Sequence, residues 1–188
     1  MAELHVVGRI VGGLEFDEEA LFCKWGVVTD DGRTDAKRWN LLEGQANGQT
    51  QVDTSKDGPM CVWSHPIDLH YSTTTIHGWP KFHIEVWSQD TFGRNFLAGY
   101  GFCHVPTTPG TFELDVHCWR PKPQGWMELV SGFFLGAYPQ LKNSDLAWRQ
   151  DDRYRLSTVA TGIVKLHLNV ITMGFEKQGI QQRGEATQ

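Results

Sequence analysis

The sequence predicts an all-β protein, an antiparallel β-sandwich of about eight strands with one short helical insertion. Several segments alternate apolar and polar side chains with a period of two, as in Phe82–Trp87, and this pattern is typical of half-buried strands. Turn-forming Gly, Pro, Asp and Asn residues separate these segments at fairly regular spacing. Short alternating strands of this kind close a core by packing two sheets face to face.

The predicted strands follow one another along most of the chain. The closing segment, Gly162–Ile171, alternates aliphatic residues with Lys, His and Asn. A weaker candidate, Thr50–Val52, lies inside the polar segment Glu43–Pro59. The other predicted strands are Leu4–Val11, Leu21–Val28, Trp39–Leu42, Cys61–Trp63, Ile67–Tyr71, Phe82–Trp87, Phe96–Val105 and Phe112–Cys118.

One segment, Gln124–Leu135, has the periodicity of a helix. Its apolar residues fall at i, i+3, i+4, i+7 and i+8, which places them on one helical face. Before this segment, the consecutive strands from Phe82 to Cys118 are joined by short loops and predict a meander. Within the meander, Gly99 and Gly101 are expected to mark a bulge or a close approach of another element.

We expect residues 1–175 to form one domain and the polar residues 176–188 to be a disordered tail.

The composition excludes several classes of function. The chain has 188 residues and a formal net charge of -5, with a pI near 5.9, whereas nucleic-acid binding relies on clustered Lys and Arg. No stretch approaches the roughly 20 apolar residues of a membrane span, and the N-terminus lacks the pattern of a signal peptide. The four cysteines are widely spaced beside apolar runs, as expected of reduced core residues. These features favour a soluble intracellular protein.

No residue pattern points to catalysis or to a cofactor. The sequence has no C-x-x-C, H-x-x-x-H or G-x-S-x-G motif. Cys103–His104 and His117–Cys118 invite a test for zinc, but in a symmetric hairpin residue 103 faces about residue 113. Five residues along a strand span roughly 16 Å, too far for shared coordination. Outward histidines such as His70 are expected to be solvated, and we predict neither an enzyme nor a metal site.

Longer stretches of the sequence resemble the B9 domain, a divergent C2-like family of the ciliary base. The resemblance extends over essentially the whole chain up to about Phe175. The stretches that carry it are Phe22–Gly26, Gly48–Thr54, Trp63–His70, Gly78–Pro80, Val86–Arg94, Leu97–Pro106 and Asp152–Leu156.

The resemblance implies a C2-like sandwich that acts as a non-enzymatic scaffold. Members of this family resemble subunits of the Meckel-syndrome/tectonic complex at the ciliary transition zone and basal body, where B9 proteins associate and the assembly gates entry into the cilium. The expected partners are therefore other B9-domain proteins and members of that complex. The expected location is the cytoplasmic side of the ciliary base. An interaction module needs no active site, which agrees with the residue patterns above.

An alternative is a peripheral membrane module that binds phospholipid weakly and without calcium. Its contacts, or those with a partner, would come from Trp87, Ser88, Asp90, Phe92 and Arg94. Trp87 is out of phase with the inward residues of its strand, so it faces either a sheet edge or a partner. Phe92 is either a membrane wedge or, as we favour, a cover for the base of the loop. Ser88 stands where calcium-type C2 domains carry aspartate, and Arg94 would oppose a divalent cation unless the acidic loop 15–19 lies at the same end.

Overall fold

Ten β-strands make up the described part of the computed structural model, which covers residues 1–29, 38–55, 58–122 and 157–176. The predicted helix Gln124–Leu135 lies outside these residues, as does nearly all of the predicted tail 176–188. The strands are β1 (Ala2–Leu14), β2 (Ala20–Val28), β3 (Trp39–Gly44), β4 (Asn47–Gln49), β5 (Asp53–Thr54), β6 (Met60–Thr73), β7 (Lys81–Gln89), β8 (Asn95–His104), β9 (Gly110–Pro121) and β10 (Thr158–Met173).

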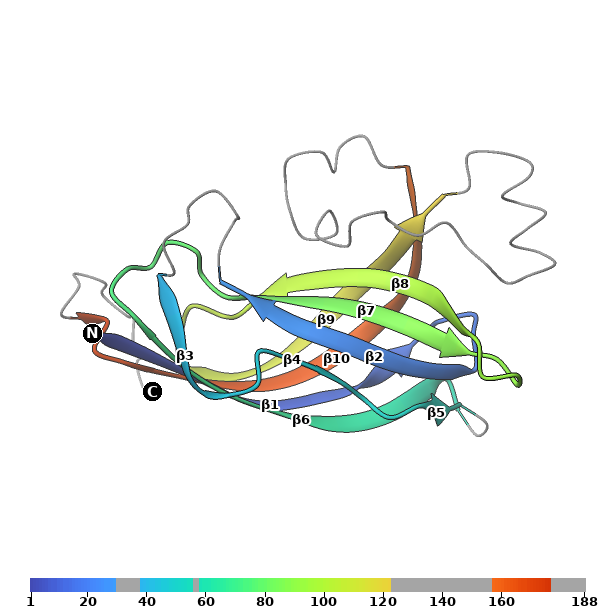
Figure 1. The fold of residues 1–188 in the computed structure, drawn as a ribbon, viewed down its shortest axis with the longest axis horizontal. Coiled ribbons are helices and arrows are strands. Elements are labelled where there is room, and N and C mark those ends of the chain that lie inside the picture. Colours follow the sequence, from blue (N-terminus) through green and yellow to red (C-terminus); the bar gives the residue numbers. More distant parts are fainter. Residues whose placement is uncertain (30–37, 56–57, 123–156, 177–188) are drawn as a thin grey trace, which may run out of the picture.

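The strands form one hydrogen-bonded path that curls into two layers (Figure 1). The order along the path is β3-β6-β1-β10-β9-β8-β7-β2-β4, and β5 pairs with β2. All of these pairs are antiparallel, which confirms the predicted fold class. A single residue pair, Tyr100 with Trp119, joins β8 to β9, so the path bends between its two halves at this point.

Side chains that point inward from both layers form the hydrophobic core. The alternation predicted for β7 is confirmed, because every second side chain from Phe82 to Val86 is buried and the intervening ones are half-buried. The alternation in β10 is confirmed in the same way. Burial of such aliphatic and aromatic surface is the main force that holds the layers together. The largest fully buried side chains are Phe82, Leu4, Ile10, Leu21, Ile67, Leu69, Ile84, Leu97, Leu166 and Leu168.

Two strand predictions differ from the structure. Cys61–Trp63 and Ile67–Tyr71 are parts of one strand, β6, which continues through a bulge where Ser64 has a φ of 45°. A bulge bends a strand and interrupts its alternation without ending it. The weak candidate Thr50–Val52 is wrong, because these residues connect β4 to β5. Thr50 is instead held by its hydroxyl, which accepts a hydrogen bond of 2.9 Å from the N–H of Cys23.

The bend between β8 and β9 explains the two glycines in β8. A Cβ atom at Gly101 would lie 2.9 Å from Val116 Cγ1 and 3.0 Å from Cys118 Sγ, and one at Gly99 would lie 2.5 Å from the Thr161 hydroxyl. The expected close approach is therefore confirmed. The symmetric register assumed for this hairpin is wrong, because β9 pairs with β10 along most of its length and meets β8 only near its end.

The corrected register brings two cysteines closer together than predicted. The pairing of Tyr100 with Trp119 places Cys118 opposite Gly101, two residues from Cys103. Both thiols are free, and burial raises the pKa of each to about 12. Their environment suits inert thiols of a core rather than metal-binding thiolates.

Candidate functional site

The predicted contact residues lie at the end of the sandwich where β7 turns into β8 (Figure 1). There the turn, the loop between β1 and β2, and β5 border an open cleft of about 630 Å³. Backbone turns at strand ends leave side chains exposed while the sheet fixes their position, which is the usual arrangement of binding loops. The lining residues are Glu18, Glu19, Ala20, Val52, Thr54, Ser88, Gln89, Asp90, Thr91 and Phe96.

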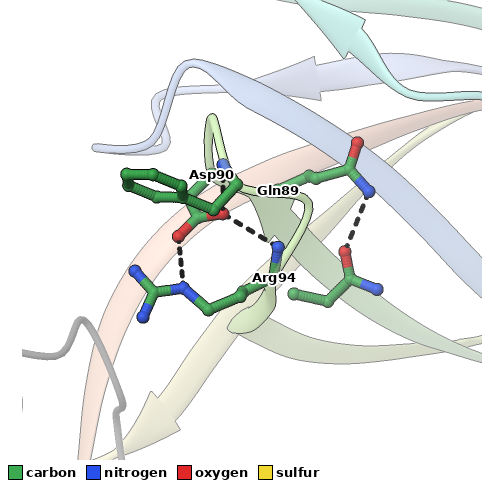
Figure 2. A network of polar contacts seen from close by, with 5 residues as sticks. Gln89, Asp90 and Arg94 are labelled. Atoms are coloured by element: carbon green, nitrogen blue, oxygen red, sulfur yellow. Dashed lines mark hydrogen bonds and ion pairs between the residues drawn. The ribbon is translucent and has the colours of Figure 1, made fainter.

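Asp90 organises the turn (Figure 2). Its Oδ1 accepts hydrogen bonds from the N–H groups of Phe92 (2.9 Å) and Arg94 (2.8 Å), and its Oδ2 accepts one from Arg94 Nε (2.7 Å). Gly93 closes the turn at a φ of 78°, where its N–H donates to the Asp90 carbonyl. Aspartate favours such turns because its carboxylate accepts from the N–H two residues on, and glycine tolerates a positive φ.

The same contacts set the charge of the Asp90 carboxylate. Its partial desolvation would raise the pKa, but the hydrogen bonds from Arg94 and Phe92 and the charge of Arg94 lower it below its usual value. Asp90 is therefore ionised at neutral pH, and its carboxylate accepts hydrogen bonds from residues of its own loop. Both of its oxygens accept hydrogen bonds within the turn, and the positive charge of Arg94 beside them opposes a cation.

The position of the Phe92 side chain differs from the one expected from the sequence. We expected its ring to cover the base of the loop, but the residue is 84% exposed at the tip of the turn. The carboxylate of Asp90 pulls the backbone N–H of Phe92 inward, and this leaves the side chain pointing out. The guanidinium of Arg94 lies 5.5 Å from the centre of the Phe92 ring and 5.6 Å from that of Phe96, within the range of a cation–π contact.

Trp87 is not part of the exposed tip. It lies on the outward side of β7, where it packs against a small cluster formed by Leu97, Tyr100 and Trp119. Its indole N–H donates to Glu85 Oε2 at 3.2 Å, and Lys24 Nζ lies 4.8 Å from its ring centre. The structure therefore places Trp87 over the strands rather than at a sheet edge.

Ser88 and the acidic loop lie beside the turn. Ser88 is 9% exposed, and its hydroxyl donates weakly, at 3.5 Å, to the Phe96 carbonyl. Glu18 and Glu19 line the same cleft as Asp90, so the acidic loop does lie at this end of the sandwich. Arg120 of β9 neutralises part of it, because its guanidinium is 2.9 Å from Glu18 and 3.7 Å from Asp17.

The described residues that line the cleft do not have the ligand arrangement of a calcium site. Burial raises the pKa of Glu18, against the opposing effect of Arg120, and one of its oxygens is buried. Among the described residues, the carboxylates of the cleft do not bring three ligand atoms within 4.8 Å of one another. Calcium prefers six to eight oxygen ligands, which this geometry does not supply.

Sequence reasoning missed two features that depend on strand register. One is the pair of Arg120 and Glu18, which are 102 positions apart. The other is a group on the opposite layer in which Glu3, His5 and His70 bring their ligand atoms within 4.8 Å of one another. The alternation of β1 and β6 places these three residues outward, but only the register of the two strands shows that they meet.

Comparisons with known proteins agree on one family. The family model described as "Ciliary basal body-associated, B9 protein" matches residues 4–171. B9 domain-containing protein 2 of Homo sapiens is 49% identical over 96% of this chain and 99% of its own length, and that of Drosophila melanogaster is 33% identical over the same shares.

More distant similarities extend over most of the chain as well. B9 domain-containing protein 1 of Xenopus laevis is 27% identical over 94% of this chain and 87% of its own length. The C2A domain of plant Extended Synaptotagmin 1 aligns with 92% of the chain and 96% of its own length, at a TM-score of 0.43 and 10% identity, which is too weak a likeness to carry an argument. The family model matches most of the chain, and the identity to B9 domain-containing protein 2 is high over its full length. This chain therefore belongs to the B9 protein family, which is described as ciliary basal body-associated.

Proposed function

We propose that the protein is a non-enzymatic scaffold subunit that binds other B9-domain proteins at the ciliary transition zone. There it would contribute to an assembly of the Meckel-syndrome/tectonic type, on the cytoplasmic side, and support cilium assembly and gating. The observation that carries this proposal is the family match over residues 4–171. The similarity to both B9 domain-containing protein 2 and B9 domain-containing protein 1 supports it, because related domains of one family suit a heteromeric complex.

We assign the partner contact to the turn between β7 and β8. Phe92 is an exposed aromatic side chain, and its backbone is fixed by Asp90 and Gly93 rather than left to adapt. Interfaces draw much of their binding energy from aromatic and arginine side chains that enter a pocket of the partner. Arg94 supplies the second such group, while Ser88 and Trp87 hold the flanking strands.

Co-expression with the B9 domain-containing protein 1 of the same organism, followed by size-exclusion chromatography, tests this function. A stable complex that elutes earlier than either protein alone is expected. Phe92→Ser should weaken it, whereas Ile76→Ser is a matched control, because Ile76 is 47% exposed and lies outside this turn. Absence of any pairwise or three-way complex with B9 proteins would contradict the proposal. Equal effects of the two variants on the complex would mean that the turn is not the contact surface.

A second candidate function is weak, calcium-independent binding to phospholipid. The observation that favours it is the exposed ring of Phe92 beside the guanidinium of Arg94, an arrangement that suits insertion beside an anionic headgroup. The carboxylates of Glu18 and Glu19 in the neighbouring cleft oppose it. No helix in the described residues has both the length and the apolar character that crossing a membrane requires.

Liposome sedimentation with and without calcium tests this second function. The wild-type protein should pellet with vesicles that contain anionic lipid, whereas Phe92→Ser should stay in the supernatant. Addition of calcium should change neither result. A protein that stays in the supernatant under both conditions would contradict it.

A further inference from the structure

A second group of functional side chains lies on the outer face of the other layer, on strands β1 and β6. His5 and His70 are direct partners across these antiparallel strands, and Glu3 precedes His5 by two residues on the same face. The two imidazole rings are 3.8 Å apart between centres, with an angle of 18° between their planes. His70 Nε2 lies 3.2 Å from Glu3 Oε2. We propose that Glu3, His5 and His70 form a binding site for a divalent transition metal ion, Zn²⁺ in particular.

The donor atoms are the ones that Zn²⁺ uses in sites with an open position. Two imidazole nitrogens and one carboxylate oxygen make a three-ligand set, and a water or another ligand completes the tetrahedron. Imidazole favours Zn²⁺, Cu²⁺ and Ni²⁺ over Mg²⁺ and Ca²⁺, which prefer oxygen ligands. The three ligand atoms already lie within 4.8 Å of one another.

The spacing of one donor pair, Glu3 and His70, agrees with tetrahedral coordination. With Zn–N and Zn–O distances of about 2.0–2.1 Å, two tetrahedral ligands are separated by about 3.3 Å. Glu3 Oε2 and His70 Nε2 are 3.2 Å apart, so this pair needs almost no movement. The rings of His5 and His70 are stacked, so one of them must turn to aim its nitrogen at the metal. The χ2 torsion of histidine is broad, which makes such a turn inexpensive.

The surroundings of the group suit a site that is fixed by the sheet and open to solvent. The side chains of His70 and Glu3 retain 18% and 29% of their exposure, so an ion can reach them. β1 is paired on both sides, with β6 and β10, and both strands hold the backbone of His5 in place. Ile171 and Met173 of β10 flank the group, and Glu43 of β3 pairs with His70 from the other side.

The hydrogen bond between Glu3 and His70 joins Oε2 and Nε2, the two atoms that would coordinate the ion. A bound ion would therefore replace the proton that these atoms share. Metal binding at histidine and carboxylate ligands releases protons for this reason. The two possibilities, a polar contact alone or a metal site, make opposite predictions for titration with zinc.

Isothermal titration calorimetry of the full chain with zinc chloride, in a buffer without chelators, tests the site. We compare the wild type with His5→Ala and Glu3→Gln, and we use His117→Ala as the matched control because it removes an outward histidine of β9 away from the group. All variants keep the four cysteines, so zinc bound by thiols does not distinguish them. Glu3→Gln keeps the size of the side chain and guards against a variant that fails to fold.

We expect the wild type and His117→Ala to bind one Zn²⁺ with the same affinity. His5→Ala and Glu3→Gln should each lose affinity by at least about tenfold, since at known sites even the loss of a residue that only hydrogen-bonds a metal ligand costs that much. Magnesium at the same concentration should give no heat of binding. Shifts of the ring signals of His5 and His70 in NMR spectra of the wild type should accompany the titration. No stoichiometric binding, or the same affinity in all four proteins, would overturn the proposal.

Discussion

Replacing Gly8 by alanine tests how strand β1 packs against its neighbour β10. Gly8 pairs with Leu168 of β10 on one side and with Ile67 of β6 on the other. A Cβ atom built on Gly8 would lie 2.1 Å from the backbone carbonyl oxygen of His167 and 2.9 Å from the Cα of Leu168. Ordinary contact begins near 3.4 Å, so the Cβ atom is about 1.3 Å too close and β1 and β10 must separate. The obstructing atoms belong to the backbone, and no side-chain rotation can relieve the overlap.

The expected cost follows from this geometry. Overpacking of a well-packed interior costs about 1–3 kcal/mol and occasionally more, and a backbone clash belongs at the upper end, near 3 kcal/mol. Loss of glycine's freedom in the unfolded chain returns about 0.4–1 kcal/mol, which leaves a net loss of at least about 2 kcal/mol. For a chain of this length, each kcal/mol lowers the Tm by about 2–4 °C.

Urea denaturation followed by tryptophan fluorescence measures the loss. Gly58→Ala is the matched control, because a Cβ atom at Gly58 meets nothing within 4 Å and its backbone has no positive φ. The control should stay within about 0.5 kcal/mol of the wild type, as surface substitutions do. Equal stability of Gly8→Ala and Gly58→Ala would refute the close backbone contact between β1 and β10.

Three further predictions concern the core and the turn. Phe82→Ala should lower the free energy of unfolding by about 3–5 kcal/mol in the same urea assay, because the ring is fully buried between the layers. Phe92→Ser should leave that free energy within about 0.5 kcal/mol of the wild type, since Phe92 is exposed, and a larger loss would mean that its ring packs onto the protein. The pKa of Asp90 is lower in the folded protein than in the unfolded chain, so its stabilising effect is present above the unfolded pKa and is lost as pH falls through the folded pKa. Asp90→Asn should therefore lower the Tm at pH 7 by more than it does near pH 2, and a Tm difference that stays constant over this range would contradict the ionised clamp.

Local sequence patterns were sufficient to predict the fold class and most strands. In β7, the alternation of Phe82, Ile84 and Val86 with polar neighbours reports directly which side chains face the core. The prediction failed where alternation is interrupted without the end of a strand, as at Ser64 in β6. A bulge leaves the same local signal as a turn, and only the pairing of β6 with β1 on both sides of it distinguishes the two.

The site was predicted in part, because its residues are contiguous but their roles depend on hydrogen bonds and register. The stretch from Trp87 to Arg94 was identified as a contact candidate, and Asp90, Phe92 and Arg94 do meet in one turn. The outward position of Phe92 follows from the Asp90 clamp, which sequence spacing alone does not reveal. The zinc ligands proposed here come from β1 and β6, where two separately outward-facing patterns become one group only after the strands are paired.

Formation of a complex with another B9 protein tests the central claim most directly. The measurement is co-expression of this chain with B9 domain-containing protein 1, with the molar mass of the eluted species determined by light scattering during size-exclusion chromatography. We expect a stable heteromeric species with a mass above that of either chain alone. A monomer of 21.3 kDa that binds no other B9 protein, offered singly or in combination, would contradict the scaffold function.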